Sequence, residues 1–546
     1  MPRSLQLRPR GRAALAATAV ALTAVATAPT ALAQTAGTSV ADRSPRLVGG
    51  FKHLVVIYEE NHSFDNLYGT WGPVGHDRVD GLSSAPASRT VQVAQDRTSY
   101  ACLLQKDVNL ASPPLASSCT DAAHGITASA FTNKPFPIDT YLPAGATTCP
   151  SPGVSAANGV LNGQGQPGGC TRDLVHRFYQ EQYQLDGGRQ DRYVSGSDAA
   201  GLTQGYYDST KLPIYSYLHG PGAPNYVVAD RFFQAAFGGS FLNHQYLIAA
   251  RAPVDTSAGA GGQDAGLHSV VDANGFPNAS YPLYKPTTTT VADRQLTQAC
   301  GATANPAVAC GDYAVNTIQP ASAPHGSGPQ LPLIDDARYP NIGDRMSAHG
   351  ISWSWYSGGW NEAEAGTPGP LFQYHHQPFN YFKDYAPGTP GRAHLKDEKD
   401  FITAATQGTL PTVSFVKPYG AENEHPGYAS EPDGSDHLVN LLKTVTSGPE
   451  AKDTLVVVTY DEFGGQWDHV SPPGTGNTPG AHDQFGPGTR IPTMLVSAGF
   501  HRSGVDHTGY DTTSILATIE RSLGLAPLDR RDARVADLRA AVFRGC

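Results

Sequence analysis

Two apolar runs that each end in acidic residues constrain the fold of this chain most. Leu54–Tyr58 leads into carboxylate and carboxamide side chains, and about 400 residues later Leu455–Val458 leads into two further carboxylates. Short, unbroken apolar runs of this kind predict strands buried on both faces of a parallel sheet. Ligands bind beyond the carboxyl ends of such strands, and neighbouring parallel strands bring those ends together. We therefore expect a divalent cation held by four oxygen donors: Glu60, Asn61, Asp461 and Glu462.

A purely structural interpretation competes with this one for the first run. The run would be an ordinary strand, and Ser63 or Asn61 would only cap the helix that follows it. The second run favours the ligand interpretation, because an independent strand ends in the same kind of residue.

The chain turns sharply after the second run. Gly464 and Gly465 permit a tight turn, and the prolines at 472–473 stop any regular element. Asp468 and His469 lie between these points and are further candidates for the pocket.

A third stretch offers a nucleophile. Tyr226–Phe233 is strand-like, and the glycines at 238–239 permit a turn that exposes the hydroxyl of Ser240. A helix beginning there would direct its first amides at an anion, and metal contact would activate the serine. The alternative is a helix N-cap serine, which is common. Asn243 and His244 are close enough in sequence to shape the same pocket.

Three separated motifs carry a family resemblance. The stretches EENHSFDNLYG (59–69), GGSFLNHQYL (238–247) and TYDEFGGQWDHVSPP (459–473) resemble the phosphoesterase family of bacterial acid phosphatases and non-specific phospholipases C, within the alkaline phosphatase superfamily. The resemblance runs from about Lys52 to Leu525, and it is more specific for the family than for the substrate.

The resemblance implies roles for particular side chains. It makes Ser240 both the nucleophile and a metal contact, and it brings His176 towards the phosphate. It also gives His375 and His376, in a predicted loop, contacts with the phosphate or the leaving group. Spacing alone favours a packed position for His176, on a helix over Asp173–Gln184. For His375 and His376 it leaves an ordinary surface role and a functional role equally open.

The remaining pattern alternates strands and helices. Leu410–Lys417 is another predicted buried strand, and His425 lies past its carboxyl end. Helices are expected at Ile342–Gly350, Leu395–Ala405, Asp436–Thr446 and Thr513–Leu523, and strands at Ile351–Tyr356 and Pro492–Ser497. We expect an α/β, alkaline-phosphatase-like sandwich: a largely parallel central sheet, helices on both faces and loop-rich insertions.

Composition divides the 546 residues into segments. A basic, then Ala-rich, then small-residue pattern predicts a signal peptide at 1–33, with cleavage near Ala33 and export from the cell. A flexible leader is expected at 34–50, a catalytic domain at 51–525 with insertions at about 70–170 and 254–330, and a tail at 526–546. No other stretch is expected to anchor the chain in a membrane.

The net charge of −10 argues against nucleic acid as a partner and favours small phosphate esters bound through a metal. The oligomeric state is not predicted.

Seven cysteines lie outside the predicted signal peptide. An exported chain meets an oxidising compartment, so we expect local disulfides, with Cys546 left free. The expected pairs are Cys102–Cys119, Cys149–Cys170 and Cys300–Cys310.

Three functions compete. The first is a secreted, metal-dependent acid phosphatase that acts through a phosphoserine; its phosphate contacts would be His176, His375, His376 and His425. Imidazolium groups with an ordinary pKa of ~6.5 would favour an acidic optimum. The second is a phospholipase C. The sequence GGSFLN argues against it, because the corresponding stretch of those enzymes resembles GPT followed by PN. The third is a non-catalytic metal- or phosphate-binding protein.

Overall fold

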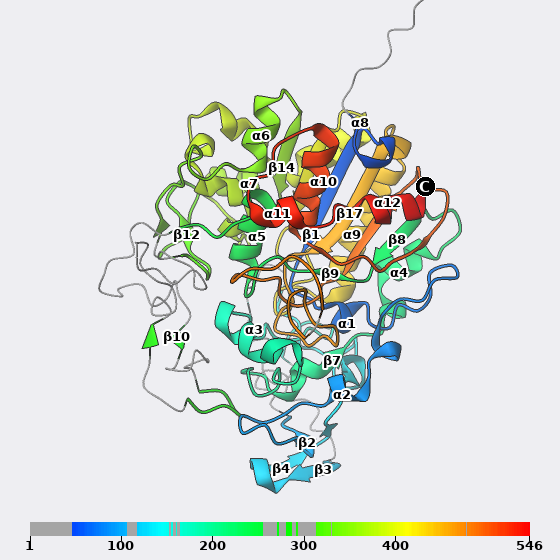
Figure 1. Cartoon of the computed structure of the whole chain (residues 1–546), viewed down its shortest axis with the longest axis vertical. Helices are drawn as coiled ribbons and strands as arrows, with labels where there is room; N and C mark the ends of the chain where they lie inside the picture. Colours follow the sequence, from blue (N-terminus) through cyan, green and yellow to red (C-terminus); the bar gives the residue numbers. More distant parts are fainter. Residues whose placement is uncertain are drawn as a thin grey trace, which may run out of the picture. The chain divides into compact units, whose positions relative to one another are not determined.

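An eight-stranded sheet organises the protein (Figure 1). The structure is a computed structural model that describes residues 46–546 except 106–116, 152–153, 155, 157–159, 161–163, 255–269, 272–279, 287–290, 293–312, 329 and 477. The sheet contains β1 (His53–Glu59), β8 (Asn225–Ala229), β14 (Trp353–Ser357), β15 (Leu395–Asp397), β16 (Val413–Lys417), β17 (Thr454–Tyr460), β18 (Thr493–Ser497) and β19 (Gly504–Asp506). Their order is β15-β14-β16-β1-β17-β18-β8-β19, so β1 and β17 are neighbours as predicted.

Neighbouring strands are parallel except at β18, which runs antiparallel to both β17 and β8. The prediction of a largely parallel sheet is confirmed. The strand expected at Pro492–Ser497 is present as β18, with its direction reversed relative to its neighbours.

Both faces of the central strands are covered. Consecutive side chains of a strand point to opposite faces, and Val55–Tyr58 are all fully buried. Every residue of β17 is likewise buried. This is the burial that the unbroken apolar runs predicted.

Helices pack around the sheet in two groups. In one, α5 contacts α6 and α10; in the other, α9 contacts α4 and α8. Figure 1 shows α10 in front of the strands. The helices are α1 (Phe64–Leu67), α2 (Ala87–Thr90), α3 (Phe178–Leu185), α4 (Pro213–Leu218), α5 (Ser240–Ala249), α6 (Ile342–Ala348), α7 (Trp360–Glu364), α8 (Glu398–Gln407), α9 (Glu431–Thr446), α10 (Thr513–Leu523), α11 (Arg530–Arg534) and α12 (Arg539–Gly545).

Three predicted helix boundaries are wrong. The helix expected from Asp173 begins only at Phe178, so His176 precedes α3. The helix expected at Leu395–Ala405 is a short strand, β15, followed by α8. Finally, α9 begins at Glu431, where the side chain of Ser430 accepts the amide of Asp433 and a proline follows the cap.

The segment predicted as a tail belongs to the fold. Within 526–546, α12 contacts β8 and β19, and Leu538, Ala541 and Val542 are fully buried. At the other end, Leu47 is also buried, so the fold begins inside the segment predicted as a flexible leader. The predicted signal peptide at 1–33 lies outside the described residues.

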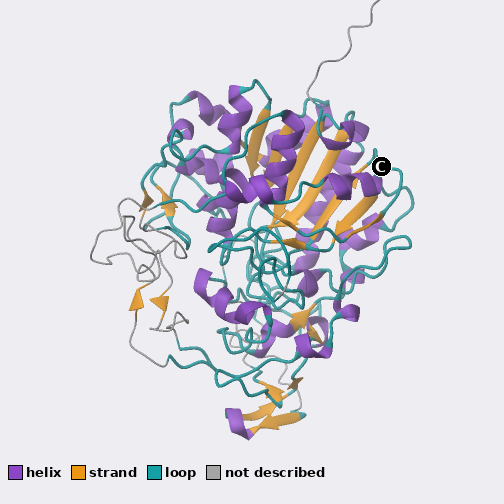
Figure 2. Ribbon diagram, viewed as in Figure 1, coloured by secondary structure: helices purple, strands orange, loops and turns teal. Residues whose placement is uncertain are grey.

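Loops gather beyond the arrowheads of the central strands (Figure 2). The disulfides Cys102–Cys119 and Cys149–Cys170 are both present in the first insertion, and Cys546 is free and exposed. Cys300 and Cys310 lie outside the described residues. No helix in the described part of the chain combines the length and the apolar character needed to cross a bilayer.

Short strands form two-stranded pairs in and beside these insertions. They are β2 (Cys102–Leu103), β3 (Cys119–Asp121), β4 (Ile126–Ser129), β5 (Phe131–Thr132), β6 (Phe136–Pro137), β7 (Gly205–Tyr206), β9 (Phe232–Phe233), β10 (Val270–Val271), β11 (Val291–Ala292), β12 (Gln319–Pro320), β13 (Gln330–Leu331) and β20 (Tyr510–Asp511).

Candidate active site

Residues at and just beyond the ends of β1 and β17 are joined by direct hydrogen bonds. The amide of Asp461 donates to the carbonyl of Glu59 (3.1 Å), and the amide of Asn61 donates to the Asp461 carboxylate (3.2 Å). Asn61 adopts a left-handed φ of 57°, which turns the chain at the end of the strand. The two acidic motifs therefore meet at one point of the sheet edge, because the strands that precede them are parallel neighbours.

Ser240 lies among the predicted ligand oxygens. Its Oγ is 3.3 Å from Glu60 Oε2, 3.4 Å from Asn61 Oδ1 and 3.5 Å from Glu462 Oε1. It is the first residue of α5, whose N-cap is Gly239. The alternative role of Ser240 as an N-cap is therefore wrong, whereas Ser63 does cap α1 by accepting the amide of Asn66.

The turn before Ser240 requires glycine. Gly238 has a φ of 88°, and a Cβ there would stand 2.6 Å from the amide nitrogen of Phe178. Asn243, a predicted pocket residue, braces this turn instead. Its side chain accepts the amide of Ala236 (2.9 Å) and donates to the carbonyl of Ala236 (3.0 Å).

The donor set fits a divalent cation. Glu60, Asp461 and Glu462 are fully buried, and Asp461 Oδ2 has no hydrogen-bond partner among the described residues. Burial and the charge of Glu60 raise the pKa of Asp461 to about 7. Burial and then Asp461 raise the pKa of Glu462 well above its usual range. Carboxylates crowded in this way need a cation to balance their negative charge. Hard oxygen donors favour Mg²⁺- or Ca²⁺-like ions.

A lysine side chain supplies one positive charge beside these carboxylates. The ammonium of Lys417, the fully buried last residue of β16, is 2.5 Å from Glu60 Oε1 and 3.1 Å from the carbonyl of Glu59. Burial alone raises the pKa of Glu60, yet Lys417 and His376 hold it well below its usual range. Glu60 thus pairs with Lys417 through Oε1 and faces Ser240 through Oε2.

Sequence reasoning missed Lys417. The only signal was a lysine that ends an otherwise apolar strand just before Pro418.

Three of the predicted phosphate-contacting histidines touch the ligand set. His376 Nε2 is 2.7 Å from Glu60 Oε1, and His176 Nε2 is 3.4 Å from Glu462 Oε1. His425 Nε2 accepts the Asn61 amide group at 2.9 Å, which leaves the Asn61 oxygen facing Ser240.

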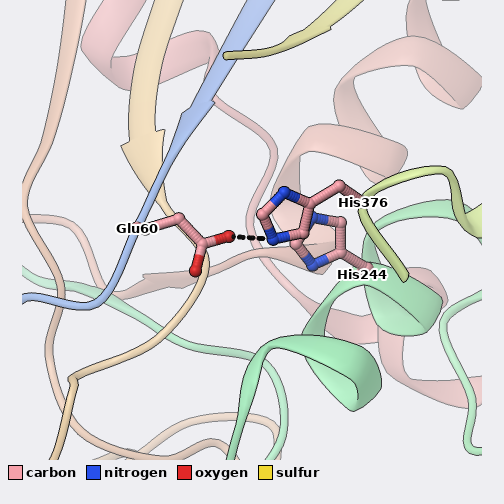
Figure 3. Close-up of side chains that lie close together, drawn as sticks. All are labelled: Glu60, His244 and His376. Carbon is pink, nitrogen blue, oxygen red and sulfur yellow. Dashed lines mark ion pairs between the residues drawn. The ribbon is translucent and has the colours of Figure 1, made fainter. Parts of the chain in front are cut away.

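A second set of possible metal donors adjoins the first. The His244 and His376 rings are stacked, with centroids 5.2 Å apart and nearly parallel planes. Figure 3 shows Glu60 directed at His376. Ligand atoms of these three residues lie within 4.8 Å of one another. His244 Nδ1–H donates to the carbonyl of Ser240 (2.7 Å), which leaves Nε2 facing this space. His375 lies beside both rings, 4.6 Å from that of His376.

The assumption that these histidines have an ordinary pKa of ~6.5 is wrong for this cluster. Burial lowers the pKa of His376 to about 4, although Glu60 opposes the effect. Burial and then His376 lower that of His375 well below 6.5, and burial and then Lys417 do the same for His244. These rings are neutral at mildly acidic pH, so they offer N–H donors or lone pairs rather than positive charge.

Two predicted pocket residues serve a different cluster. His469 Nδ1 is 2.5 Å from Asp65 Oδ2, and Arg490 Nε donates to Asp468 at 3.0 Å. Arg490 also reaches Asp65 at 3.0 Å. We call this set, Asp65, Asp468, His469 and Arg490, the arginine-centred network. It ties the first motif to the third instead of facing Ser240.

A recess of 370 Å³ lies beside Ser240, whose chain neighbours Gly239 and Phe241 line it. Gly239 and His176 form its boundary with the ligand set, and Asp173, Arg177 and Phe241 also line it. Such a volume accommodates a small leaving group.

A family model identifies the class of this protein. The model described as "Phosphoesterase family" matches residues 132–526, so the chain belongs to this family. Similar curated proteins include non-specific phospholipase C6 of Arabidopsis thaliana, 30% identical over 27% of this chain and 32% of that protein. Phospholipase C B of Mycobacterium tuberculosis is 32% identical over 26% of this chain and 30% of that protein. The chain spans about a third of the length of these relatives.

Solved structures with similarity include a 2-O GAG sulfatase, 12% identical with a TM-score of 0.29 over 63% of this chain and 71% of that chain. Another is a protein in the alkaline phosphatase superfamily from Vibrio parahaemolyticus, 14% identical with a TM-score of 0.21 over 35% of this chain and 50% of that chain.

Proposed function

We propose that this protein is a metal-dependent phosphoester hydrolase with Ser240 as nucleophile. The observation that carries the proposal is the position of Ser240 Oγ, within 3.5 Å of oxygens from Glu60, Asn61 and Glu462, on the first turn of α5. Membership of the phosphoesterase family supports it.

The proposed ligands are Glu60, Asn61, Ser240, Asp461 and Glu462. A divalent ion held there would lower the pKa of the serine hydroxyl and offset charge on the phosphoryl oxygens. The first amides of α5 point at the same place and favour an anion. Ser240 Oγ attacks phosphorus, the ester oxygen leaves, and water then attacks the phosphoserine to release phosphate.

The histidines would divide the remaining work. Neutral His375 would donate its N–H group to a phosphoryl oxygen, whereas the single N–H of neutral His376 would be held by the Glu60 carboxylate. His176 stands between Glu462 and the recess, which places it to protonate the departing oxygen. His425 would fix the Asn61 amide so that its oxygen faces the nucleophile.

We propose phosphomonoesters as the substrates. The recess beside Ser240 is small, and Asp173, Arg177 and Asp198 bring charge to its lining, which suits a polar leaving group better than an acyl glycerol. Among the described residues, large apolar side chains that are exposed are scattered singly, at Val154, Ile402 and Phe543. Enzymes that work on a lipid surface present a gathered apolar or basic face to it.

Phospholipase C activity is the second candidate. The names of the similar curated proteins favour it. The decisive experiment measures p-nitrophenol release from its phosphate against choline headgroup release from lecithin, at matched enzyme and divalent-metal concentrations. Faster monoester turnover supports the proposal. Preferential headgroup release establishes the second candidate, and no turnover of either substrate leaves the non-catalytic binding protein.

We also propose export from the cell. The two disulfides support it, because such bonds persist in oxidising compartments. Mass spectrometry of protein from the culture medium or periplasm tests it. A mature chain that begins near Gln34 is expected, and retention of the intact chain in the cytoplasm contradicts the proposal.

A further inference from the structure

A cavity of 720 Å³ lies at the end of α5 opposite Ser240. Its wall includes Tyr246 and Arg251 from the end of that helix, together with α11 and the loop at 481–485. Ser240 and Ala249 begin and end α5, and ten residues of helix span about 15 Å. The cavity is therefore separate from the candidate active site, and nothing in the proposed reaction uses it.

Arginine dominates the lining of this cavity. The five arginines are Arg251, Arg338, Arg530, Arg531 and Arg534. Only two acids accompany them. Asp483 is 2.6 Å from the guanidinium of Arg531, and Asp529 is 3.3 Å from that of Arg251. Within each of these two pairs the aspartate balances the charge of the arginine.

Three positive charges are left without compensation. The guanidinium groups of Arg338, Arg530 and Arg534 form no ion pair with any described residue, and all three side chains are exposed. The whole chain carries a net charge of −10. A local excess of positive charge in a concave wall of an acidic protein concentrates anions there.

The walls also provide aromatic surface. Tyr313 and Phe485 line the cavity and pack edge to face with ring centres 5.1 Å apart. A volume of this size is in the range that holds cofactor-sized molecules. Guanidinium groups bind phosphate through paired N–H donors.

We infer that this cavity binds a small organic molecule carrying two or more phosphate groups. Three uncompensated guanidinium groups exceed what a single phosphate requires, and the aromatic wall gives the organic part a surface. Nucleoside polyphosphates and inositol polyphosphates share this chemistry. The inference does not depend on the proposed hydrolase activity.

Calorimetric titration of the full-length chain tests the inference. The Ser240→Ala variant is the parent protein, because it prevents turnover of the probes. Adenosine triphosphate and myo-inositol hexakisphosphate are titrated separately, with and without the added pair Arg530→Gln and Arg534→Gln. Binding at the candidate active site is common to both proteins, so their difference reports the cavity. We expect roughly tenfold weaker binding of at least one probe when the two arginines are replaced.

A matched control removes two exposed cations elsewhere that form no ion pair with any described residue, Arg78→Gln and Lys134→Gln. We expect it to leave the affinity within about twofold of the parent, since distant surface charges are screened. Arg338→Gln alone provides a second cavity variant in case the double variant does not fold. Equal affinities in the parent and the cavity variants overturn the inference. Equal weakening in the cavity and control variants also overturns it, because that result reports net charge alone. The probe that loses affinity identifies which polyphosphate the cavity prefers.

Discussion

Two buried clusters of acids lie next to the same two motifs, and they differ in how their charge is balanced. In the arginine-centred network, Arg490 and His469 stand between Asp65 and Asp468, with contacts of 2.5–3.0 Å. Around Ser240 lie three buried carboxylates, and Lys417 pairs with one of them, Glu60. Burying charge is costly unless it is paired. A cluster balanced by the chain itself maintains the fold, and a cluster left short of positive charge is a place for a ligand.

The largest expected effect concerns the proposed nucleophile, Ser240. Ser240→Ala should lower the rate by several orders of magnitude, by analogy with the roughly 10⁶-fold loss in a serine hydrolase. Ser240→Thr keeps the hydroxyl and serves as the matched control, with partial activity expected. A chiral phosphate ester should show net retention of configuration, because two in-line displacements occur. Inversion together with a mildly impaired alanine variant would show that water attacks directly.

The second prediction concerns metal, which the unbalanced cluster should bind and the balanced network should not. Chelation should abolish activity, and Asp461→Asn should lower the metal bound per chain in elemental analysis. Because this substitution also removes one of the repelling carboxylates, it should leave the metal-free fold at least as stable as the parent. Full activity of protein shown to be free of metal contradicts the prediction.

The third prediction concerns the balanced network. Arg490→Met leaves Asp65 and Asp468 buried without their shared cation, so the free energy of unfolding should fall by roughly 3–5 kcal/mol. Chemical denaturation of Arg490→Met and Asp461→Asn, both metal-free, measures the contrast directly. The comparison between the clusters fails if both substitutions shift the free energy of unfolding in the same direction by similar amounts.

The smallest expected effect is the pH dependence of stability. Bound metal should change the part that comes from Asp461 and leave the part that comes from His469 unchanged. Asp461 in the metal-free fold has its pKa raised to about 7, so the fold binds a proton that the unfolded chain releases near ~3.9. Its stabilising effect is therefore present at low pH and is lost as the pH rises towards 7. Added divalent ion should raise the thermal midpoint more at pH 7 than at pH 4.

His469 provides the contrasting signal. Burial lowers its pKa, but Asp65 and Asp80 outweigh burial and raise the pKa to about 9. The stability it adds is fully present below ~6.5 and disappears as the pH rises through about 9. This slope should persist with bound metal and vanish in His469→Gln. A slope between pH 6.5 and 9 that survives in His469→Gln rules out this assignment.

The sequence allowed the candidate site to be predicted where strand ends alone decide position. Glu60, Asn61, Asp461 and Glu462 meet because β1 and β17 are parallel neighbours. Lys417 was missed because its role depends on β16 lying on the other side of β1, which its own sequence does not encode. The contacts of Asp468 and His469 were not predictable for the same reason, since Arg490 comes from a separate segment. The reversed direction of β18 was not predictable either, because an apolar run reads the same in both directions.

The bond between the ends of β1 and β17 joins residues 400 positions apart in the chain. Two central strands that pair across most of the polypeptide give the fold a high contact order, which slows folding. During synthesis, β1 has no permanent partner on this side until residues near 460 have emerged. The proposed site is therefore completed late and in one step, because its two acidic motifs meet only when β17 pairs with β1.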